Sequence, residues 1–411
     1  MTDPTDPTGP CFLSYKRERA IEAGLLVDAL RDHGVPTWQD VSDLPSAPTE
    51  TSLKRVLNDP ATSGAVLLAT PEVEKSDVIR KVEVPQIFAR ARRGDGFFAV
   101  PVAAGGLGYG DMARVLGPML GLTDISGYNV TRAAENPFGT DFATTVGRRA
   151  LRERLDAIHH HAPAGESLTV QVSTRAALPK TTGVALRVDL TRRFEGRQAK
   201  PGAWDRHILP AFRAIAEEIG RTAPGRPVDV TGFPSLPAAV ALGAALPSLG
   251  PVRAGWLQEQ AKFATPTERW SLDGVGGACG FESEVFEQSV SADDLALLVS
   301  ATNDVVHDFT LSRTGLALRA VVHLAPPLRA GRLQLDAGQA RDLACRAVDA
   351  TRAAVAEFAA RGAIHLFLAV PAGVAFMIGQ QLNTLGRVQT YEHDPAADTP
   401  YVPAALLTPS S

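Results

Sequence analysis

The residues best suited to binding chemistry lie in one loop, between positions 192 and 204. This loop follows a strand expected at Val184–Leu190 and combines four cations, two aromatic side chains and flexible glycines. Cations bind phosphate oxygens and aromatic faces stack on bases, so the mixture suits a small nucleotide ligand. The candidate contacts are Arg192, Arg193, Phe194, Arg197, Lys200 and Trp204. For each residue alone a solvated loop is the better interpretation, and only their clustering favours binding.

Further binding candidates lie in two other places of the C-terminal half. Arg253, Trp256 and Lys262 follow a short strand expected near Val252. Pro371 marks a loop at the end of a strand, where backbone amides can meet a ligand, and Tyr391 offers a face for stacking.

The sequence lacks the common signatures of metal and cofactor sites. There is no Gly-x-Gly-x-x-Gly, no Walker loop and no His-Glu-x-x-His. Cys11, Cys279 and Cys345 are too far apart for a zinc motif, and their odd number argues against a disulfide framework. Residues 159–161 are consecutive histidines, which diverge around a helix. We therefore expect no metal and no resident cofactor.

Composition limits the classes of partner. The 411 residues predict two or three domains, and the net charge of −4 argues against binding DNA or RNA polymers. No apolar stretch approaches the roughly 18 residues of a membrane span, and the polar N-terminus has no signal-peptide core. We expect a cytoplasmic protein that does not bind membranes. A local basic loop for a small anion is compatible with this acidic total.

Strands alternate with helices in the first 125 residues, which predicts an α/β unit with a parallel sheet. Buried strands are expected at 11–16 and 64–70, and the helical spacing of apolar residues at 18–33 ends at Gly34. A long loop rich in proline follows Trp38. We interpret residues 126–165 as a connector.

Residues 166–411 contain an internal repeat. Gly243-x-x-Leu-x-x-Leu-Gly-x-Val252 recurs as 379–388 at an offset of 136 residues, and the same offset aligns the strand at 228–232 with that at 364–368. A proline-led segment just upstream of each copy matches with a slip of two residues. The pattern predicts two fused α/β units of similar plan, about 166–285 and 286–411.

The N-terminal unit resembles the TIR domain family over residues 10–125. Residues 12–16 (Phe-Leu-Ser-Tyr-Lys) resemble its opening box, and the loop after Trp38 falls at the position of its BB loop. Residues 76–83 resemble the serine-to-glutamate stretch that carries the catalytic glutamate of NAD-cleaving members. Val78 replaces the usual aromatic residue, and the spacing from Ser76 to Glu83 is one residue longer than the commonest form. The resemblance implies a flavodoxin-like fold.

The same resemblance implies hydrolysis of NAD⁺, with Glu83 as the catalytic carboxylate. Nicotinamide is already a cationic leaving group, so a carboxylate beside the ribose need only stabilise the oxocarbenium-like cation. Ser14, Tyr15, Arg17, Trp38 and Asp43 are the implied contacts of NAD⁺. Glu72 and Glu74 are competing carboxylates, and Glu83 also fits a solvated residue paired with Arg80 or Lys81. Trp38 equally fits a core aromatic residue.

The C-terminal half resembles the SAVED domain, itself two fused CARF-like (Rossmann-like) units, over residues 166–408. The stretch 364–392 carries the resemblance: a strand, a proline loop, a helix, a glycine and a strand ending in Tyr-Glu. SAVED domains sense cyclic oligonucleotides in CBASS antiphage systems. The resemblance therefore implies a cyclic tri- or tetranucleotide ligand, with cyclic tri-adenylate favoured.

Together the two resemblances imply a CBASS effector that degrades NAD⁺ once its ligand binds. Ligand binding is expected to drive head-to-tail self-association into oligomers or filaments. One alternative is a TIR module without enzymatic activity that recruits a partner. A nuclease is disfavoured because the N-terminal unit has no Asp/Glu-x-Lys pattern in a strand.

Overall fold

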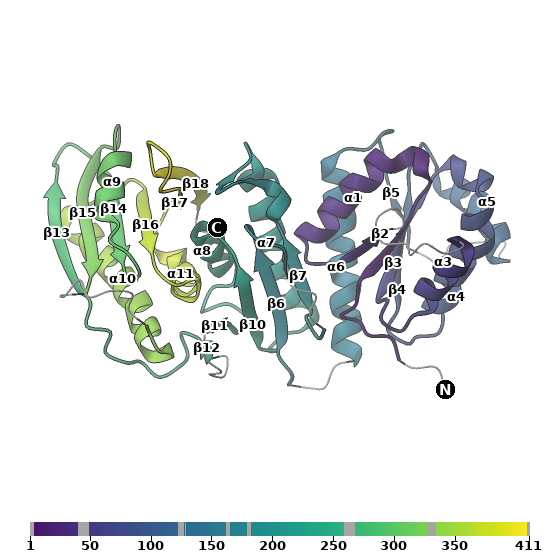
Figure 1. Ribbon diagram of the computed structural model, residues 1–411, viewed down its shortest axis with the longest axis horizontal. Coiled ribbons are helices and arrows are strands. Elements are labelled where there is room, and N and C mark those ends of the chain that lie inside the picture. Colours follow the sequence, from purple (N-terminus) through teal and green to yellow (C-terminus); the bar gives the residue numbers. More distant parts are fainter. Residues whose placement is uncertain are drawn as a thin grey trace. The chain divides into compact units, whose positions relative to one another are not determined.

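The computed structural model describes residues 4–39, 49–121, 127, 129–161, 165–178, 182–258, 268–326 and 334–408. These residues form two compact units (Figure 1). Unit 1 takes residues from 1–171, 179–188 and 217–224, and unit 2 takes residues from 172–178, 189–216 and 225–411. No helix in the described ranges is long and apolar enough to cross a membrane.

Unit 1 is built on a parallel five-stranded sheet of order β2-β1-β3-β4-β5. The strands are β1 (Cys11–Ser14), β2 (Thr37–Gln39), β3 (Gly64–Ala69), β4 (Phe98–Ala103) and β5 (Thr131–Arg132). Strands β1 and β3 are buried along their whole length, which is why both read as apolar runs in the sequence. The strand order is flavodoxin-like, as expected. In such sheets ligands bind at the carboxyl ends of β1 and β3, where the direction of winding reverses.

Helices cover both faces of this sheet (Figure 1). Helices α1 (Ala20–Asp32) and α6 (Thr140–His161) pack together on one face, while the other carries α3 (Thr49–Asn58), α4 (Val84–Ala91) and α5 (Tyr109–Leu120). A Cβ on Gly147 of α6 would lie 2.8 Å from the carbonyl oxygen of Ala29, so a glycine is needed where α6 crosses α1. Residues 126–165, expected as a connector, contribute β5 and α6 to unit 1.

One buried arginine joins three segments of unit 1. Arg154 of α6 has no exposed surface and donates to the carbonyl oxygens of Gly9 (2.6 Å) and Ala185 (2.7 Å) and to Oγ of Ser63 (3.1 Å). It also donates to the carbonyl of Thr8. Burial lowers the pKa of this guanidinium to about 10. The main-chain acceptors replace the water that a buried cation loses.

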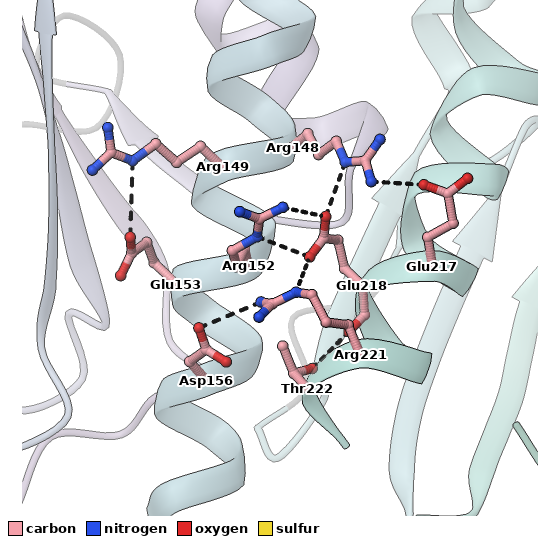
Figure 2. Close-up of polar contacts among 9 residues, drawn as sticks. All are labelled: Arg148, Arg149, Arg152, Glu153, Asp156, Glu217, Glu218, Arg221 and Thr222. Carbon is pink, nitrogen blue, oxygen red and sulfur yellow. Dashed lines mark hydrogen bonds and ion pairs between the residues drawn. The ribbon is translucent and has the colours of Figure 1, made fainter. Parts of the chain in front are cut away.

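A cluster of ion pairs fixes the end of helix α7 (Leu209–Thr222) to α6, within unit 1 (Figure 2). The carboxylate of Glu218 accepts hydrogen bonds from Arg148 (2.9 Å), Arg152 (2.9 and 3.0 Å) and Arg221 (2.8 Å). Glu218 is 1% exposed, whereas the three arginine side chains are nearly half exposed. Burial raises the pKa of Glu218, but the three arginines outweigh burial and lower it to about 2.

The rest of the chain contributes two further sheets. Their orders are β12-β11-β10-β6-β7 and β13-β15-β14-β16-β17-β18. The strands of the first are β6 (Leu168–Ser173), β7 (Leu186–Asp189), β10 (Val228–Phe233), β11 (Ala254–Gln258) and β12 (Glu268–Trp270). Those of the second are β13 (Glu282–Gln288), β14 (Asp294–Ser300), β15 (Leu318–Ala325), β16 (Ile364–Ala369), β17 (Val388–His393) and β18 (Tyr401–Leu407). The helices between these strands are α8 (Leu236–Ala245), α9 (Val306–Ser312), α10 (Ala337–Phe358) and α11 (Ala372–Gly379). In addition, β8 (Phe194–Glu195) pairs with β9 (Gln198–Ala199) in a small hairpin.

These two sheets share one plan, as the sequence repeat predicts. One reads β7-β6-β10-β11-β12 and the other β15-β14-β16-β17-β18, with an added edge strand β13. In both, the last strand is antiparallel to its neighbour. Strands β10 and β16 keep the predicted offset of 136 residues at both ends. Strands β11 and β17 begin at Ala254 and Val388, so the two-residue slip falls after the helix and not before it.

Helices α8 and α11 cross at the two glycines of the repeat. A Cβ on Gly243 would lie 2.1 Å from the carbonyl oxygen of Phe376, and a Cβ on Gly379 would lie 2.1 Å from that of Val240. The two contacts are reciprocal, because each glycine meets the residue three positions before the other. Backbone contact this close excludes any side chain at either position.

Candidate functional site

Ser14 and Glu83 form a buried pair at the carboxyl end of β1. The Oγ of Ser14 donates to Oε2 of Glu83 at 2.5 Å, and the two residues are 1% and 5% exposed. Ser14 is the last residue of β1 and lies opposite Leu67 of β3. The pair therefore occupies the point in this sheet where flavodoxin-like folds bind ligands.

A π-helical turn brings Glu83 to Ser14. Residues 79–83 form this turn, and the N–H of Val84 donates to the carbonyl of Ile79, five residues earlier. A π turn accommodates one residue more than an α turn, and such turns are frequent at functional sites.

The competing carboxylates and cations are engaged elsewhere. Glu72 accepts a hydrogen bond from Arg19 at 2.8 Å, which lowers the pKa of Glu72 to about 2, and Glu74 pairs with Arg114 at 2.6 Å. The cations of the turn, Arg80 and Lys81, lie 4.0 and 3.2 Å from Asp77. Among these three glutamates, Glu83 is the buried one that contacts Ser14.

Three of the remaining predicted NAD⁺ contacts lie in β2 or shortly after β1. Tyr15 is half-buried directly after β1, and Arg17 is exposed at the start of a short 3₁₀ turn. Trp38 of β2 packs on Phe12, with ring centroids 5.4 Å apart, and contacts the apolar core. Asp43 lies outside the described residues.

A second candidate site is a cavity of about 350 Å³ within unit 2. Its walls come from residues at the ends of β16 and β17 and from residues that follow β10 and β14, so the cavity lies at the carboxyl ends of these strands. Two predicted ligand contacts line it, Arg197 from the tip of the β8–β9 hairpin and Tyr391. Open α/β sheets bind ligands at such edges.

Polar side chains are concentrated where β17 ends in this cavity. Glu392 is 3% exposed and accepts hydrogen bonds from Oγ of Ser235 (2.6 Å) and from Arg175 (3.3 Å). Burial raises the pKa of Glu392 to about 7, against the opposing effects of Ser235 and Arg175. The next residue, His393, lies 2.8 Å from Asp308 of α9. The arrangement can hold phosphate on Arg175 and Arg197 and can exchange protons at Glu392 and His393.

Several of the other predicted ligand contacts lie in or beside the β8–β9 hairpin. Phe194 and Trp204 are both 7% exposed and pack edge to face, with centroids 6.1 Å apart, so they stabilise the hairpin. Arg192 and Arg193 lie in a 3₁₀ turn before it, and Lys200 is exposed after it.

The predicted ligand contacts near β11 and α11 also lie in different parts of the fold. Trp256 is 2% exposed and packs on Phe376 at 5.9 Å, inside the core. Arg253 precedes β11, so it lies at the amino end of the sheet. Pro371 is the N-cap of α11, and Lys262 lies outside the described residues.

The side chain of Tyr391 contacts other side chains of the protein. Its ring stacks on Phe367 at 4.3 Å, and its hydroxyl lies 2.6 Å from Nδ1 of His365. Glu392 and His393 are not among the contacts predicted from the sequence, although Glu392 ends the stretch 364–392 that carries the SAVED resemblance. β17 also contains the polar Gln389 and Thr390, so the pattern of the strand does not single out its last two residues. In the part of the chain described, no group of three His, Cys, Asp or Glu side chains can hold a metal ion.

Comparison with known proteins finds a family model that matches part of the chain. Residues 211–407 match the family model of SAVED, the SMODS-associated and fused to various effectors sensor domain. The Acinetobacter baumannii Cap4 SAVED/CARF-domain containing receptor, solved with the cyclic trinucleotide 3′3′3′-cAAA, is 11% identical, with a TM-score of 0.49, over 94% of this chain and 97% of that chain. The Moraxella osloensis Cap4 receptor is 12% identical, with a TM-score of 0.44, over 95% and 99%. No curated protein matches the sequence. The SAVED match contains the whole lining of the unit 2 cavity except Arg175 and Arg197.

Proposed function

We propose that this chain is an antiphage NAD⁺ glycohydrolase that a cyclic oligonucleotide switches on. Unit 1 hydrolyses NAD⁺ to ADP-ribose and nicotinamide, and unit 2 binds the activator, cyclic tri-adenylate being our first choice. The observation that carries the enzymatic part is the buried Ser14–Glu83 pair at the β1/β3 switch point. The SAVED match of residues 211–407 supports the sensor part.

Glu83 performs the catalytic role through its charge. Loss of nicotinamide leaves a positive charge on the ribose, and a carboxylate fixed beside it stabilises this charge more than it stabilises the substrate. The hydroxyl of Ser14 donates to Oε2 of Glu83 and so fixes the carboxylate at the end of β1. A water molecule then attacks the cation and gives ADP-ribose.

Unit 2 recognises the activator by charge and shape. Arg175 and Arg197 reach the cavity at the end of β17 and can bind the phosphates. The proposal includes ligand-driven self-association of the chain through a heterologous contact, which builds filaments when the contact does not close.

The test is a nicotinamide-release assay on the full chain, with a panel of cyclic di-, tri- and tetranucleotides and light scattering followed in parallel. We expect release and particle growth with one cyclic trinucleotide. Glu83→Gln should lower release at least 100-fold while ligand-induced growth persists. Glu74→Gln is the matched control, because Glu74 lies in the preceding 3₁₀ turn (Pro71–Lys75) and pairs with Arg114.

Two results would contradict the proposal. Turnover that survives Glu83→Gln would remove the catalytic assignment. Ligand-induced growth of the wild-type chain without any nicotinamide release would favour the non-enzymatic scaffold.

A further inference from the structure

The Ser14–Glu83 pair joins two loop segments of unit 1, one after β1 and one after β3. Ser14 ends β1, and a 3₁₀ turn (Arg17–Arg19) follows shortly after it. Glu83 belongs to the π turn, which the 3₁₀ turn Pro71–Lys75 precedes in the chain. Two side chains from separate loops keep a productive geometry only when the loops themselves are fixed to each other. A second contact between these loops therefore bears directly on the site.

An ion pair between Arg19 and Glu72 is such a contact. Nη2 of Arg19 donates to Oε1 of Glu72 at 2.8 Å, and the two side chains are 17% and 33% exposed. Nη1 of Arg19 donates to Glu22 of α1 at 3.2 Å and to Oδ1 of Asn136 at 3.1 Å. The guanidinium is thus held by three segments of the chain, and the position of Glu72 is fixed relative to all of them.

Main-chain hydrogen bonds connect the ion pair to the site on both segments. On the first, the N–H of Arg19 donates to the carbonyl of Lys16 at 2.7 Å, two residues beyond the end of β1. On the second, the fully buried Val73 accepts from the N–H of Ser76 at 3.1 Å. The carbonyl of Ser76 in turn accepts from the N–H of Arg80 in the π turn at 3.0 Å. A shift of the 3₁₀ turn after β3 is therefore passed on to the π turn.

The surroundings of Arg19 suit a positioning role better than the binding of a substrate phosphate. Two carboxylates, those of Glu22 and Glu72, offset its positive charge at close range. A cation neutralised in this way attracts a further anion only weakly. Arg17, two positions earlier, is exposed, and it is the arginine that the sequence predicts as a contact of NAD⁺.

We propose that Arg19 is a positioning residue of the Ser14–Glu83 site, because its ion pair with Glu72 fixes the π turn relative to the segment after β1. A carboxylate held in one place stabilises the cationic transition state, whereas NAD⁺ in the ground state gains little from it. Loss of Arg19 therefore lowers kcat and leaves KM nearly unchanged. A displacement of about 1 Å can slow a reaction by about 100-fold.

The inference rests on the proposed function, because its kinetic test is nicotinamide release by the full chain with the activating cyclic trinucleotide of the panel. Arg19→Ala should lower kcat about 10- to 100-fold and change KM less than about twofold. Arg19→Lys keeps the charge but offers one nitrogen in place of two, so its kcat should lie between those of Arg19→Ala and wild type. The double variant Arg19→Ala/Glu72→Gln should be no slower than Arg19→Ala, because the two residues act as one unit.

Arg114→Ala is the matched control. Arg114 pairs at 2.6 Å with Glu74, which belongs to the same 3₁₀ turn as Glu72, but it connects this turn to α5 and not to the segment after β1. Its kcat should stay within about twofold of wild type, since the pair is exposed and contributes little. Thermal unfolding of each variant checks that the chain is folded.

Amide hydrogen exchange gives a readout that needs neither turnover nor activator. In Arg19→Ala the amides of residues 76–84 should exchange at least about 10-fold faster than in wild type, while those of β4 keep their rates. In Arg114→Ala the amides of residues 76–84 should exchange as in wild type. A residue that only stabilises the fold would instead change exchange throughout unit 1.

Failure of the inference can be told from failure of the proposed function. If wild type releases nicotinamide and Arg19→Ala keeps its kcat, the positioning role is wrong and the proposed function stands. If exchange rises in β4 as much as in residues 76–84, Arg19 only stabilises the fold and the inference is overturned. If wild type releases no nicotinamide with any cyclic nucleotide of the panel, the proposed function fails, and exchange at residues 76–84 decides by itself whether Arg19 holds the π turn.

Discussion

Replacing Glu218 by glutamine tests whether the arginine cluster of Figure 2 stabilises unit 1. The pKa of Glu218 falls from 4.5 to about 2, and one pKa unit corresponds to about 1.4 kcal/mol. The carboxylate thus contributes about 3 kcal/mol at neutral pH. Because the three arginines are nearly half exposed, they regain water in the variant. We therefore expect a loss of about 2–3 kcal/mol in the free energy of unfolding.

Urea unfolding at pH 7 measures this loss. With a slope of about 2 kcal/mol per molar urea, the midpoint should fall by about 1 M. Glu217→Gln is the matched control, since Glu217 is 58% exposed and pairs with Arg148 on the surface. Its effect should stay below about 0.5 kcal/mol.

The dependence on pH gives a second, independent readout. A lowered pKa in the folded state stabilises the protein above the ordinary pKa of a glutamate, and the stabilisation is lost as that carboxylate becomes protonated. The difference between wild type and Glu218→Gln should therefore be full above pH 4.5 and shrink as the pH falls toward 2. Equal midpoints at pH 7, or a difference that remains undiminished at pH 2, would refute the reasoning.

Three further substitutions test helix packing and a buried cation. Gly243→Ala and Gly379→Ala should each lower the stability of unit 2 by about 1–3 kcal/mol, because the new Cβ would press on a carbonyl of the facing helix. The double variant should lose less than the sum, since helices that have already separated accommodate the second methyl group; additive losses in urea unfolding would contradict this. Arg154→Met should cost about 3–5 kcal/mol, because carbonyls such as those of Gly9 and Ala185 lose their donor. A melting temperature of Arg154→Met within 2 °C of wild type would show that the buried guanidinium is dispensable.

Features carried by local spacing were predictable from the sequence. The apolar spacing of residues 18–33 located α1, and the run at 64–70 located β3. The repeat was visible because Gly243 and Gly379 are fixed by one helix crossing, which tolerates no side chain.

Positions that depend on long-range contacts were not predictable. Trp256 and Arg253 were expected beyond a strand near Val252, but β11 begins only at Ala254. That difference of two residues moves Arg253 to the amino end of the sheet and Trp256 into its core. Glu392 becomes a site residue through Ser235 and Arg175, which are distant in sequence, so no local pattern reveals it.

The reciprocal crossing of α8 and α11 has the geometry of a subunit interface. In a two-fold homodimer, residue i of one subunit contacts residue j of the other, and j contacts i. The contacts of Gly243 with Phe376 and of Gly379 with Val240 have this form within one polypeptide. The two repeats thus meet as the subunits of a symmetric dimer do, although one polypeptide carries both. Unlike the subunits of a homodimer, the two halves can carry different residues at equivalent strand ends, here Gln258 and Glu392.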